Sequence, residues 1–192
     1  MNTQPPSATI TPSFQWVFQK PLRILAFGFG SGLNPVGPGT VGTLWAWLAF
    51  LVGAHFLNST QWWWMIGISA VTGCWICGQV SEELGKKDFG GIVWDEIVSF
   101  WLILLLISPS TIYLQTLAFA LFRLFDALKP GPIGLIDRHF KNLETLDSNT
   151  PSNSRQIWWR GFGIMIDDLA AALFTLFALS LLQLGIHYIT QQ

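Results

Sequence analysis

Five apolar segments separated by short polar stretches dominate the pattern of hydrophobic and polar positions along the chain. They cover residues 43–57, 62–80, 92–108, 114–128 and 169–189. A helix needs about 20 residues to cross the hydrocarbon core of a bilayer, and each segment crosses it or nearly does so. The stretches "HFLNSTQ" and "SPST" are short enough to join antiparallel helices directly. The pattern therefore predicts an all-α, polytopic helical membrane protein with about five membrane-embedded helices.

The distribution of lysine and arginine predicts the orientation of these helices. If the N-terminus is cytoplasmic, residues 1–42, 81–91 and 126–168 face the cytoplasm and hold nine of the ten basic residues. The tenth, Arg123, lies at the cytoplasmic end of the fourth segment, and the connectors on the opposite side carry no lysine or arginine. Cytoplasmic loops of membrane proteins are enriched in these residues, so a cytoplasmic N-terminus is predicted.

Composition supports this class and argues against others. Of the 192 residues 51% are hydrophobic and 11% are charged, whereas soluble domains contain about 25% charged residues. The net charge of −1 and the absence of a basic tail give no reason to expect a nucleic-acid partner. The N-terminus lacks a basic stretch followed by an apolar core, so it is not interpreted as a cleavable signal peptide.

Cys74 and Cys77 form a CxxC pair inside an apolar segment, and we interpret them as packing residues rather than a redox or zinc pair.

The predicted topology also gathers the acidic residues on the cytoplasmic side. Asp95 and Glu96 open the third segment, Asp126 closes the fourth, and Asp167 and Asp168 open the fifth, while Asp88 and Asp137 lie in the adjoining loops. An acid near a helix N-terminus gains a few tenths to about 1 kcal/mol from the helix dipole. That effect does not explain Asp126, at a helix C-terminus, although Arg123 three residues earlier can neutralise it. A functional cluster of carboxylates at the cytoplasmic interface is therefore predicted.

Two acidic pairs occur in similar surroundings. "GIVWDEIV" at residues 91–98 and "GIMIDDLA" at residues 163–170 each place two acids between a Gly-Ile and an apolar helix, and both enter the membrane from the same side. Facing carboxylate pairs supply the oxygen ligands that a hard cation such as Mg2+ prefers. A bound cation would also explain why acids are tolerated beside apolar helices.

Two further segments have the chemistry of phosphate binding. Six glycines in "GFGSGLNPVGPGTVGT", residues 28–43, allow a ligand close to the backbone, but the segment lacks a preceding strand and the lysine of a Walker loop. It is equally a turn before a helix, in which Thr40 and Thr43 suit a helix N-cap or a phosphate contact. In "FRLFDALKPGPIGLIDRHF", residues 122–140, bases alternate with acids. They can form ion pairs, contact lipid headgroups or hold a phosphate beside a metal.

The chain lacks the residues that other kinds of phosphate chemistry require. No histidine lies where a phosphohistidine mechanism needs one, and neither a DxDxT motif nor a serine–histidine arrangement is present. Phosphate chemistry would therefore depend on metals and carboxylates. A cation- or proton-coupled transporter is the alternative, because acids within membranes also mark ion paths, but its acids would reach the bilayer midplane. A structural membrane subunit explains the acids least well.

Four of these stretches together resemble a known family. "GFGSGLNPVGPGTVGT", "GIVWDE", "FRLFDALKPGPIGLID" and "GFGIMIDD", spread from residue 25 to residue 171, resemble phosphatidylglycerophosphatase A, a bacterial membrane enzyme. The resemblance implies an Mg2+-dependent phosphatase that converts phosphatidylglycerophosphate into phosphatidylglycerol at the cytoplasmic face of the inner membrane. Whether water or an aspartate attacks the phosphorus, how many Mg2+ ions bind and whether the chain forms oligomers stay open.

The resemblance also implies roles for individual residues. The acids expected to bind metal are Asp95, Glu96, Asp126, Asp167 and Asp168, and those expected to be catalytic are Asp95, Glu96, Asp126 and Asp168. The residues expected to contact phosphate or substrate are Gly39, Thr40, Arg123, Lys129, Asp137 and Arg138. Residues 1–24 are expected to form a polar or amphipathic N-terminal segment, and residues 25–192 a single domain with an inserted cytoplasmic loop at residues 141–158.

Overall fold

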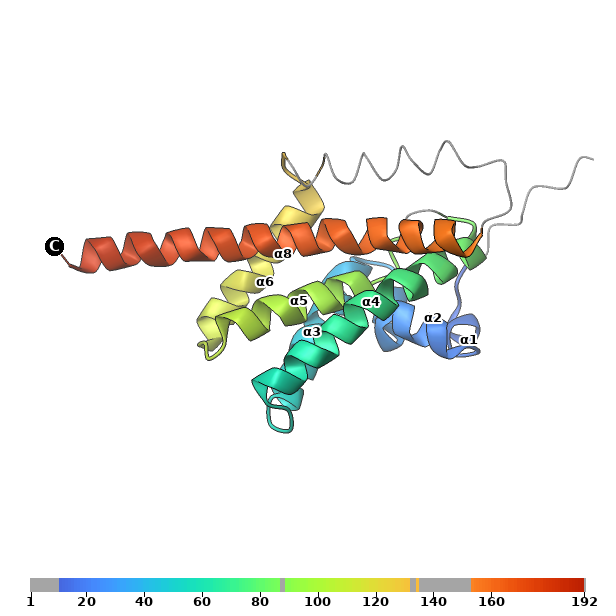
Figure 1. The fold of residues 1–192 in the computed structure, drawn as a ribbon, viewed down its shortest axis with the longest axis horizontal. Helices are drawn as coiled ribbons and strands as arrows, with labels where there is room; N and C mark the ends of the chain where they lie inside the picture. The colour runs from blue at the N-terminus through green and yellow to red at the C-terminus, as the bar shows by residue number, and fades with distance from the viewer. Residues whose placement is uncertain (1–10, 87–88, 132–133, 135–152, 192) are drawn as a thin grey trace, which may run out of the picture.

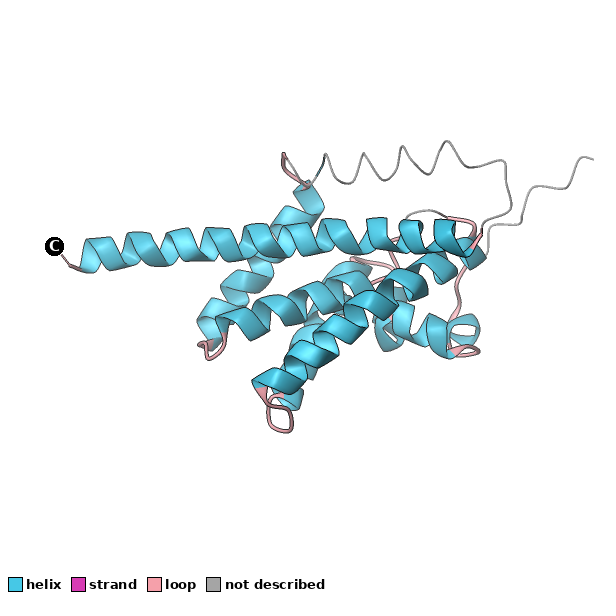
Figure 2. Ribbon diagram, in the orientation of Figure 1, coloured by secondary structure: helices cyan, strands magenta, loops and turns pink. Residues whose placement is uncertain are grey.

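The computed structural model describes residues 11–86, 89–131, 134 and 153–191, and these residues form helices and loops without a β-strand (Figures 1 and 2). Three short elements come first, and five long helices follow, labelled as in Figure 1. The short ones are α1 (Phe14–Val17), α2 (Pro21–Ala26) and the 3-10 helix η1 (Gly28–Leu33). The long ones are α3 (Pro38–Gly53), α4 (Ser59–Leu84), α5 (Trp94–Ile107), α6 (Ile112–Leu128) and α8 (Ser154–Thr190).

Each long helix contains or overlaps one of the five predicted apolar segments, so the prediction of an all-α fold is confirmed for the described residues. Two of them, α4 and α8, are long and apolar enough to cross a membrane by length and composition. The predicted hairpin turns have clear local causes. Asn58 and Gln61 form a reciprocal capping box that starts α4, and the Thr111 side chain caps α6.

Helix α5 lies at the centre of the bundle and packs against α3, α4, α6 and α8. Its apolar side chains point in every direction around the helix, and Ile97, Phe100 and Leu104 are fully buried. A helix that is hydrophobic on all sides is stable only when other helices or lipid surround it. The sequence of α5 therefore accounts for its central position, and this position carries Asp95 and Glu96 into the protein.

Helix α8 differs from the prediction at its N-terminus. It begins at Ser154, where Asn153 and Gln156 form a capping box, and it continues for 37 residues. Asp167 and Asp168 therefore lie well inside the helix, and the prediction that they open it was wrong. The helix dipole consequently does not explain these two acids. Residues 154–158, expected to belong to a cytoplasmic loop, are helical, and residues 141–152 of that loop lie outside the described part of the chain.

Glycines allow α4 and α8 to approach closely along their common interface. A Cβ atom added at Gly78 would overlap Ile157 O, and one added at Gly161 would overlap Cys74 O. Small residues of this kind let the backbones of membrane helices touch. The cysteines pack in the same region: both are buried and free, and Cys74 Sγ donates to Ala70 O at 3.3 Å. Their burial in this interface agrees with the interpretation as packing residues.

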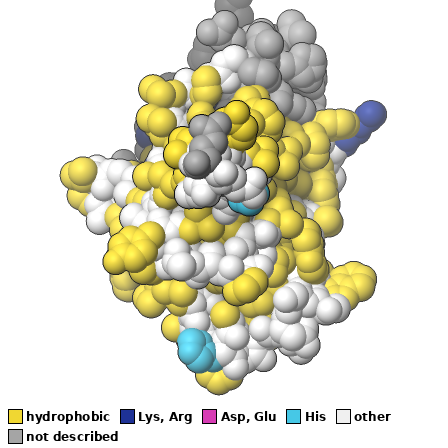
Figure 3. All heavy atoms as spheres, turned by 90° about the vertical axis from the view of Figure 1, so that its left-hand side faces the viewer, with side chains coloured by type: hydrophobic (Ala, Val, Ile, Leu, Met, Phe, Trp, Pro, Cys, Tyr) yellow, Lys and Arg dark blue, Asp and Glu magenta, His cyan; other side chains and the backbone are white. Residues whose placement is uncertain are grey.

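The outer surface of the bundle is rich in exposed large apolar side chains, among them Leu48 on α3, Trp64 on α4 and Leu184 on α8. Figure 3 shows the face at the α8 C-terminus, where hydrophobic side chains predominate and no described Asp or Glu is visible. Exposed apolar surface on this scale indicates contact with lipid or another apolar partner.

The close approach of α4 and α8 can be tested at one glycine. Gly161→Ala should destabilise the protein by about 1–3 kcal/mol, because the new methyl group overlaps the backbone of α4. Gly185→Ala in the same helix meets no atom within 4 Å and should be neutral or slightly stabilising. Thermal unfolding of both variants in detergent measures the difference. Equal melting temperatures for the two would contradict this packing.

Candidate active site

Three helices bring five carboxylates to one place in the bundle. Asp95 and Glu96 come from the first turn of α5, Asp126 from the last turn of α6, and Asp167 and Asp168 from the interior of α8. We call these five side chains the acid cluster. The carboxylate of Asp168 is close enough to the other four for significant electrostatic repulsion. The structure thus places together the acids that the sequence singled out on three separate helices.

The acid cluster is largely shielded from solvent. Asp95 is 7% exposed and Asp168 is 4% exposed. Three buried carboxylate oxygens have no hydrogen-bond partner among the described residues: Asp95 Oδ1, Glu96 Oε2 and Asp168 Oδ2. A buried polar atom without a partner is costly, and a buried negative charge more so. The arrangement therefore favours a ligand that can be bound by several oxygens.

Two cations among the described residues form ion pairs with the acid cluster. Arg123 Nη1 lies 3.0 Å from Glu96 Oε1 and 2.9 Å from Asp126 Oδ2, and Lys129 pairs with Asp167. The predicted pairing of Arg123 with Asp126 is therefore present, but the same guanidinium is shared with Glu96. Among these seven side chains, five acids and two bases leave a formal excess of three negative charges (5 − 2).

The glycine-rich segment approaches the acid cluster through the first turn of α3. Gly37 is the N-cap of α3 with φ of +61°, a conformation that glycine adopts without strain, and Pro38 follows as the first helical residue. A Cβ atom added at Gly39 would overlap the Glu96 carboxylate. The backbone amides of a first helical turn have no partner within the helix and attract anions. Gly39 thus places such amides beside the carboxylates.

The two threonines of this segment have different environments. Thr43 is buried, and its hydroxyl donates to Gly39 O at 2.8 Å, so it is occupied within α3. Thr40 is half-buried in the first turn of α3, beside Gly39. The N-cap is Gly37, so the interpretation of either threonine as an N-cap was wrong. Thr40 stays available for a phosphate contact.

The carboxylate oxygens of the acid cluster are suitable ligands for a hard cation, but in this structure they do not converge on one point. Carboxylate oxygens are the ligands that Mg2+ and Ca2+ prefer, and three of them lack partners here. In the part of the chain that the structure describes, no three His, Cys, Asp or Glu side chains already form a metal-binding group. Binding a cation would therefore require the side chains of the acid cluster to rearrange.

Some predicted residues cannot be placed, and one neighbour was not expected. Asp88, Asp137 and Arg138 lie outside the described residues. Cys77 on α4 lies close enough to Asp95 and Asp168 to interact electrostatically with both. Its sequence context, an apolar stretch, indicated packing and contained no signal for a position beside the carboxylates.

These observations define a class: an all-helical protein with membrane-length helices and a buried carboxylate site beside a helix N-terminus. The chain belongs to the phosphatidylglycerophosphatase A family, because the sequence model of that family matches residues 24–146. This membership makes the protein a phosphatase, a phosphoric monoester hydrolase. The matched residues include Gly39, Asp95, Glu96 and Asp126, whereas Asp167 and Asp168 follow them in the chain.

Curated relatives extend the similarity over most of the chain. It is 34% identical to phosphatidylglycerophosphatase A of Haemophilus influenzae over 163 residues, 85% of this chain and 89% of the relative. It is 33% identical to phosphatidylglycerophosphatase A of Escherichia coli K12 over 79% of this chain and 77% of the relative. A putative phosphatidylinositol-3-phosphatase of Bacteroides thetaiotaomicron is 28% identical over 79% of this chain and 87% of the relative. No solved structure matches the chain.

The contact between Gly39 and Glu96 can be tested by adding one methyl group. Gly39→Ala should lower phosphatase turnover by about 10²-fold, because displacing a reacting group by about 1 Å can cost that much. Gly90→Ala, where an added Cβ meets no atom within 4 Å, is the control and should retain activity. Steady-state phosphate release measures both. Wild-type turnover in Gly39→Ala would exclude the close approach of α3 to Glu96.

Proposed function

We propose that the protein is an Mg2+-dependent lipid phosphatase that hydrolyses the terminal phosphomonoester of phosphatidylglycerophosphate, giving phosphatidylglycerol and phosphate. The observation that carries this proposal is the acid cluster beside the first turn of α3, in which three oxygens have no hydrogen-bond partner among the described residues. The names of the Haemophilus influenzae and Escherichia coli relatives support the choice of substrate. Helix amides and basic side chains would bind the anionic phosphate, and a bound cation would neutralise the excess negative charge of the acids.

The proposal includes a membrane topology of five spans with a cytoplasmic N-terminus, in the inner membrane of a bacterium. Residues 169–190 of α8 extend about 33 Å at 1.5 Å per residue, enough to cross a hydrocarbon core of about 30 Å. Asp168 would then lie at the cytoplasmic interface, level with lipid phosphates. The absence of lysine and arginine from the connectors at residues 55–61 and 108–111 supports this orientation.

The carboxylates of Asp95, Glu96, Asp126, Asp167 and Asp168 are the groups that would hold Mg2+. A bound Mg2+ would contribute Lewis-acid polarisation of the phosphoryl group and neutralise its charge. Among the described residues, Asp95, Glu96 and Asp168 each keep a buried oxygen without a hydrogen-bond partner, and this supports the assignment, as does the net negative charge of the cluster. Asp137, placed with the phosphate contacts by the family resemblance, lies outside the described residues.

The side chains and amides of the chain itself would orient the phosphate. The backbone of Gly39, in the first turn of α3, lies against the Glu96 carboxylate, and in this proposal the amides of Gly39 and Thr40 donate to phosphoryl oxygens. Arg123 and Lys129 already reach the acid cluster from α6 and its C-cap, so they can turn toward a bound phosphate. Arg138 would add a further cation from the segment outside the described residues.

The hydrolysis needs a base and a proton donor as well as charge neutralisation. Water attacks phosphorus, the bond from phosphorus to the glycerol oxygen breaks, and that oxygen takes up a proton. Asp95 and Asp168 are buried carboxylates with a partnerless oxygen, so either can accept the proton of the attacking water. Glu96 and Asp126, which share Arg123, complete the set of proposed catalytic acids.

The transporter alternative receives less support from the same geometry. Transport sites formed by intramembrane acids commonly lie where a helix is interrupted. Helix α8 runs without interruption through Asp167 and Asp168. The family membership and the position of the acids beside the α3 N-terminus favour phosphate chemistry.

Purified protein should release phosphate from phosphatidylglycerophosphate in Mg2+, and excess EDTA should abolish the release until Mg2+ is restored. Phosphate assay on mixed micelles measures this. Phosphatidylinositol 3-phosphate belongs in the same panel because of the name of the third relative. Undiminished turnover in EDTA would contradict the metal dependence. Turnover of the inositol lipid alone would replace the proposed substrate.

Asp95→Asn and Asp168→Asn should each lower turnover by at least about 10²-fold, because each removes a buried carboxylate to which this proposal assigns proton transfer. The control is Glu82→Gln, an acid-to-amide change of an exposed acid, 40% exposed, that pairs with the half-buried Arg160; it should retain activity within about twofold. Phosphate release and membrane insertion are measured on all three. Wild-type turnover in both cluster variants would refute the role of the carboxylates.

A further inference from the structure

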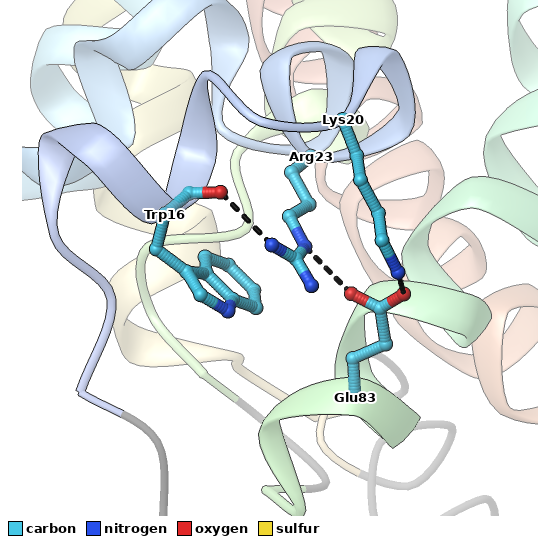
Figure 4. Close-up of polar contacts among 4 residues, drawn as sticks. All are labelled: Trp16, Lys20, Arg23 and Glu83. Atoms are coloured by element: carbon cyan, nitrogen blue, oxygen red, sulfur yellow. Dashed lines mark hydrogen bonds and ion pairs between the residues drawn. The ribbon is translucent and has the colours of Figure 1, made fainter.

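Four side chains join the start of α2 to the last turn of α4 (Figure 4). Arg23 donates through Nε to Glu83 Oε2 at 2.7 Å and through Nη1 to the Trp16 carbonyl at 3.0 Å. Its guanidinium carbon lies 3.7 Å from the centroid of the Trp16 ring. Lys20 donates to Glu83 Oε1 at 2.7 Å. We call Trp16, Lys20, Arg23 and Glu83 the α2–α4 clamp.

The two cations of the clamp differ in burial, so they differ in how much each contributes to holding α2 on α4. The side chain of Arg23 is 10% exposed, whereas that of Lys20 is 52% exposed. Removing one partner of a buried ion pair leaves a charge without compensation and is strongly destabilising, whereas exposed pairs contribute little. Stacking on Trp16 also requires the planar guanidinium of an arginine. The contact between Arg23 and Glu83 is therefore the dominant one.

Helix α2 depends on such contacts for its position. It has six residues and no side-chain cap at its N-terminus. Isolated helices of this length are not stable in water, so tertiary contacts have to hold α2 in place. The clamp supplies them at one end by binding Arg23 and the N-cap residue Lys20 to α4.

The other end of α2 contacts the residues that directly precede Asp95 and Glu96 in the chain. Ala26 O, at the end of α2, accepts a hydrogen bond of 2.9 Å from the amide of Val93. Val93 is the N-cap of α5 and lies two residues before Asp95. In η1, which follows α2, a Cβ atom added at Gly32 would overlap Gly91 O. The position of α2 therefore determines where α5 begins.

We propose that Glu83 and Arg23 are positioning residues for Asp95 and Glu96. They hold α2 on α4, and α2 in turn fixes the first residues of α5 through the bond between Ala26 and Val93. The inference rests on the proposed function, in which these two carboxylates take part in catalysis. It gives a role in the reaction to Arg23, which precedes the residues that the family model matches.

Glu83→Gln in the full-length protein tests the proposal kinetically. We expect kcat for phosphatidylglycerophosphate to fall at least fivefold while KM stays within twofold, because the phosphate contacts come from α3 and α6. Glu83→Asp keeps the charge and should recover part of the loss. Lys20→Gln, which removes only the exposed partner, is the matched control and should retain kcat within twofold. Unchanged kcat in Glu83→Gln overturns the proposal.

Hydrogen exchange at the start of α5 provides a readout that does not require activity. In Glu83→Gln the amides of residues 92–94 should exchange at least tenfold faster, whereas Lys20→Gln and the amides of α6 should match the wild type. Wild-type exchange at residues 92–94 overturns the proposal. Uniformly faster exchange in every helix shows a role in global stability alone and also overturns it. If the wild type releases no phosphate, the proposed function fails, and the exchange result still decides whether the clamp positions α5.

Discussion

The interaction on which the rest of the structure depends is the partial compensation of five carboxylates, three buried and two half-buried, by two cations among the described residues. Arg123 is shared between Glu96 and Asp126, and Lys129 pairs with Asp167. Asp95 and Asp168 each keep an oxygen without a partner among the described residues. Negative charge of this density is unfavourable beside apolar helices unless a positively charged ligand or protons compensate it. The fold therefore contains a site that is incomplete without a ligand.

Bringing these carboxylates together requires close contact between helices that carry little other polarity. Helix α5 occupies the centre because it is apolar on all sides, and α8 reaches it because Gly78 and Gly161 let α4 and α8 pack backbone to backbone. At the first turn of α3, Gly39 leaves room for the Glu96 carboxylate. Small residues thus serve two purposes: Gly78 and Gly161 permit the packing of α4 and α8, and Gly39 leaves room for a carboxylate of the site.

Most of the helices could be predicted because hydrophobic segments and capping residues are local signals. The N-terminus of α8 was misplaced because the polar-to-apolar boundary at Asp167 was taken as the helix start. That boundary reflects a change in the polarity of the residues, and the helix continues across it. The true start is the capping box of Asn153 and Gln156. The acids of the site were found from their spacing and the predicted topology, whereas Cys77 was not expected there because an apolar neighbourhood resembles any packed core.

The sequence by itself determined most of the helices, the acidic pairs and the glycine-rich approach to α3, because each depends on residue types within one short segment. It determined the family through four such segments together. Only the tertiary structure decided which charges meet. The contacts that it decided are Arg123 with Glu96, Lys129 with Asp167, Gly39 with Glu96 and Arg23 with Glu83. The partners in each pair lie on different helices or at a helix end. In the three ion pairs, the partners are 27 to 60 positions apart in the chain. Whether they meet depends on the rotation and crossing of whole helices, which no local pattern specifies.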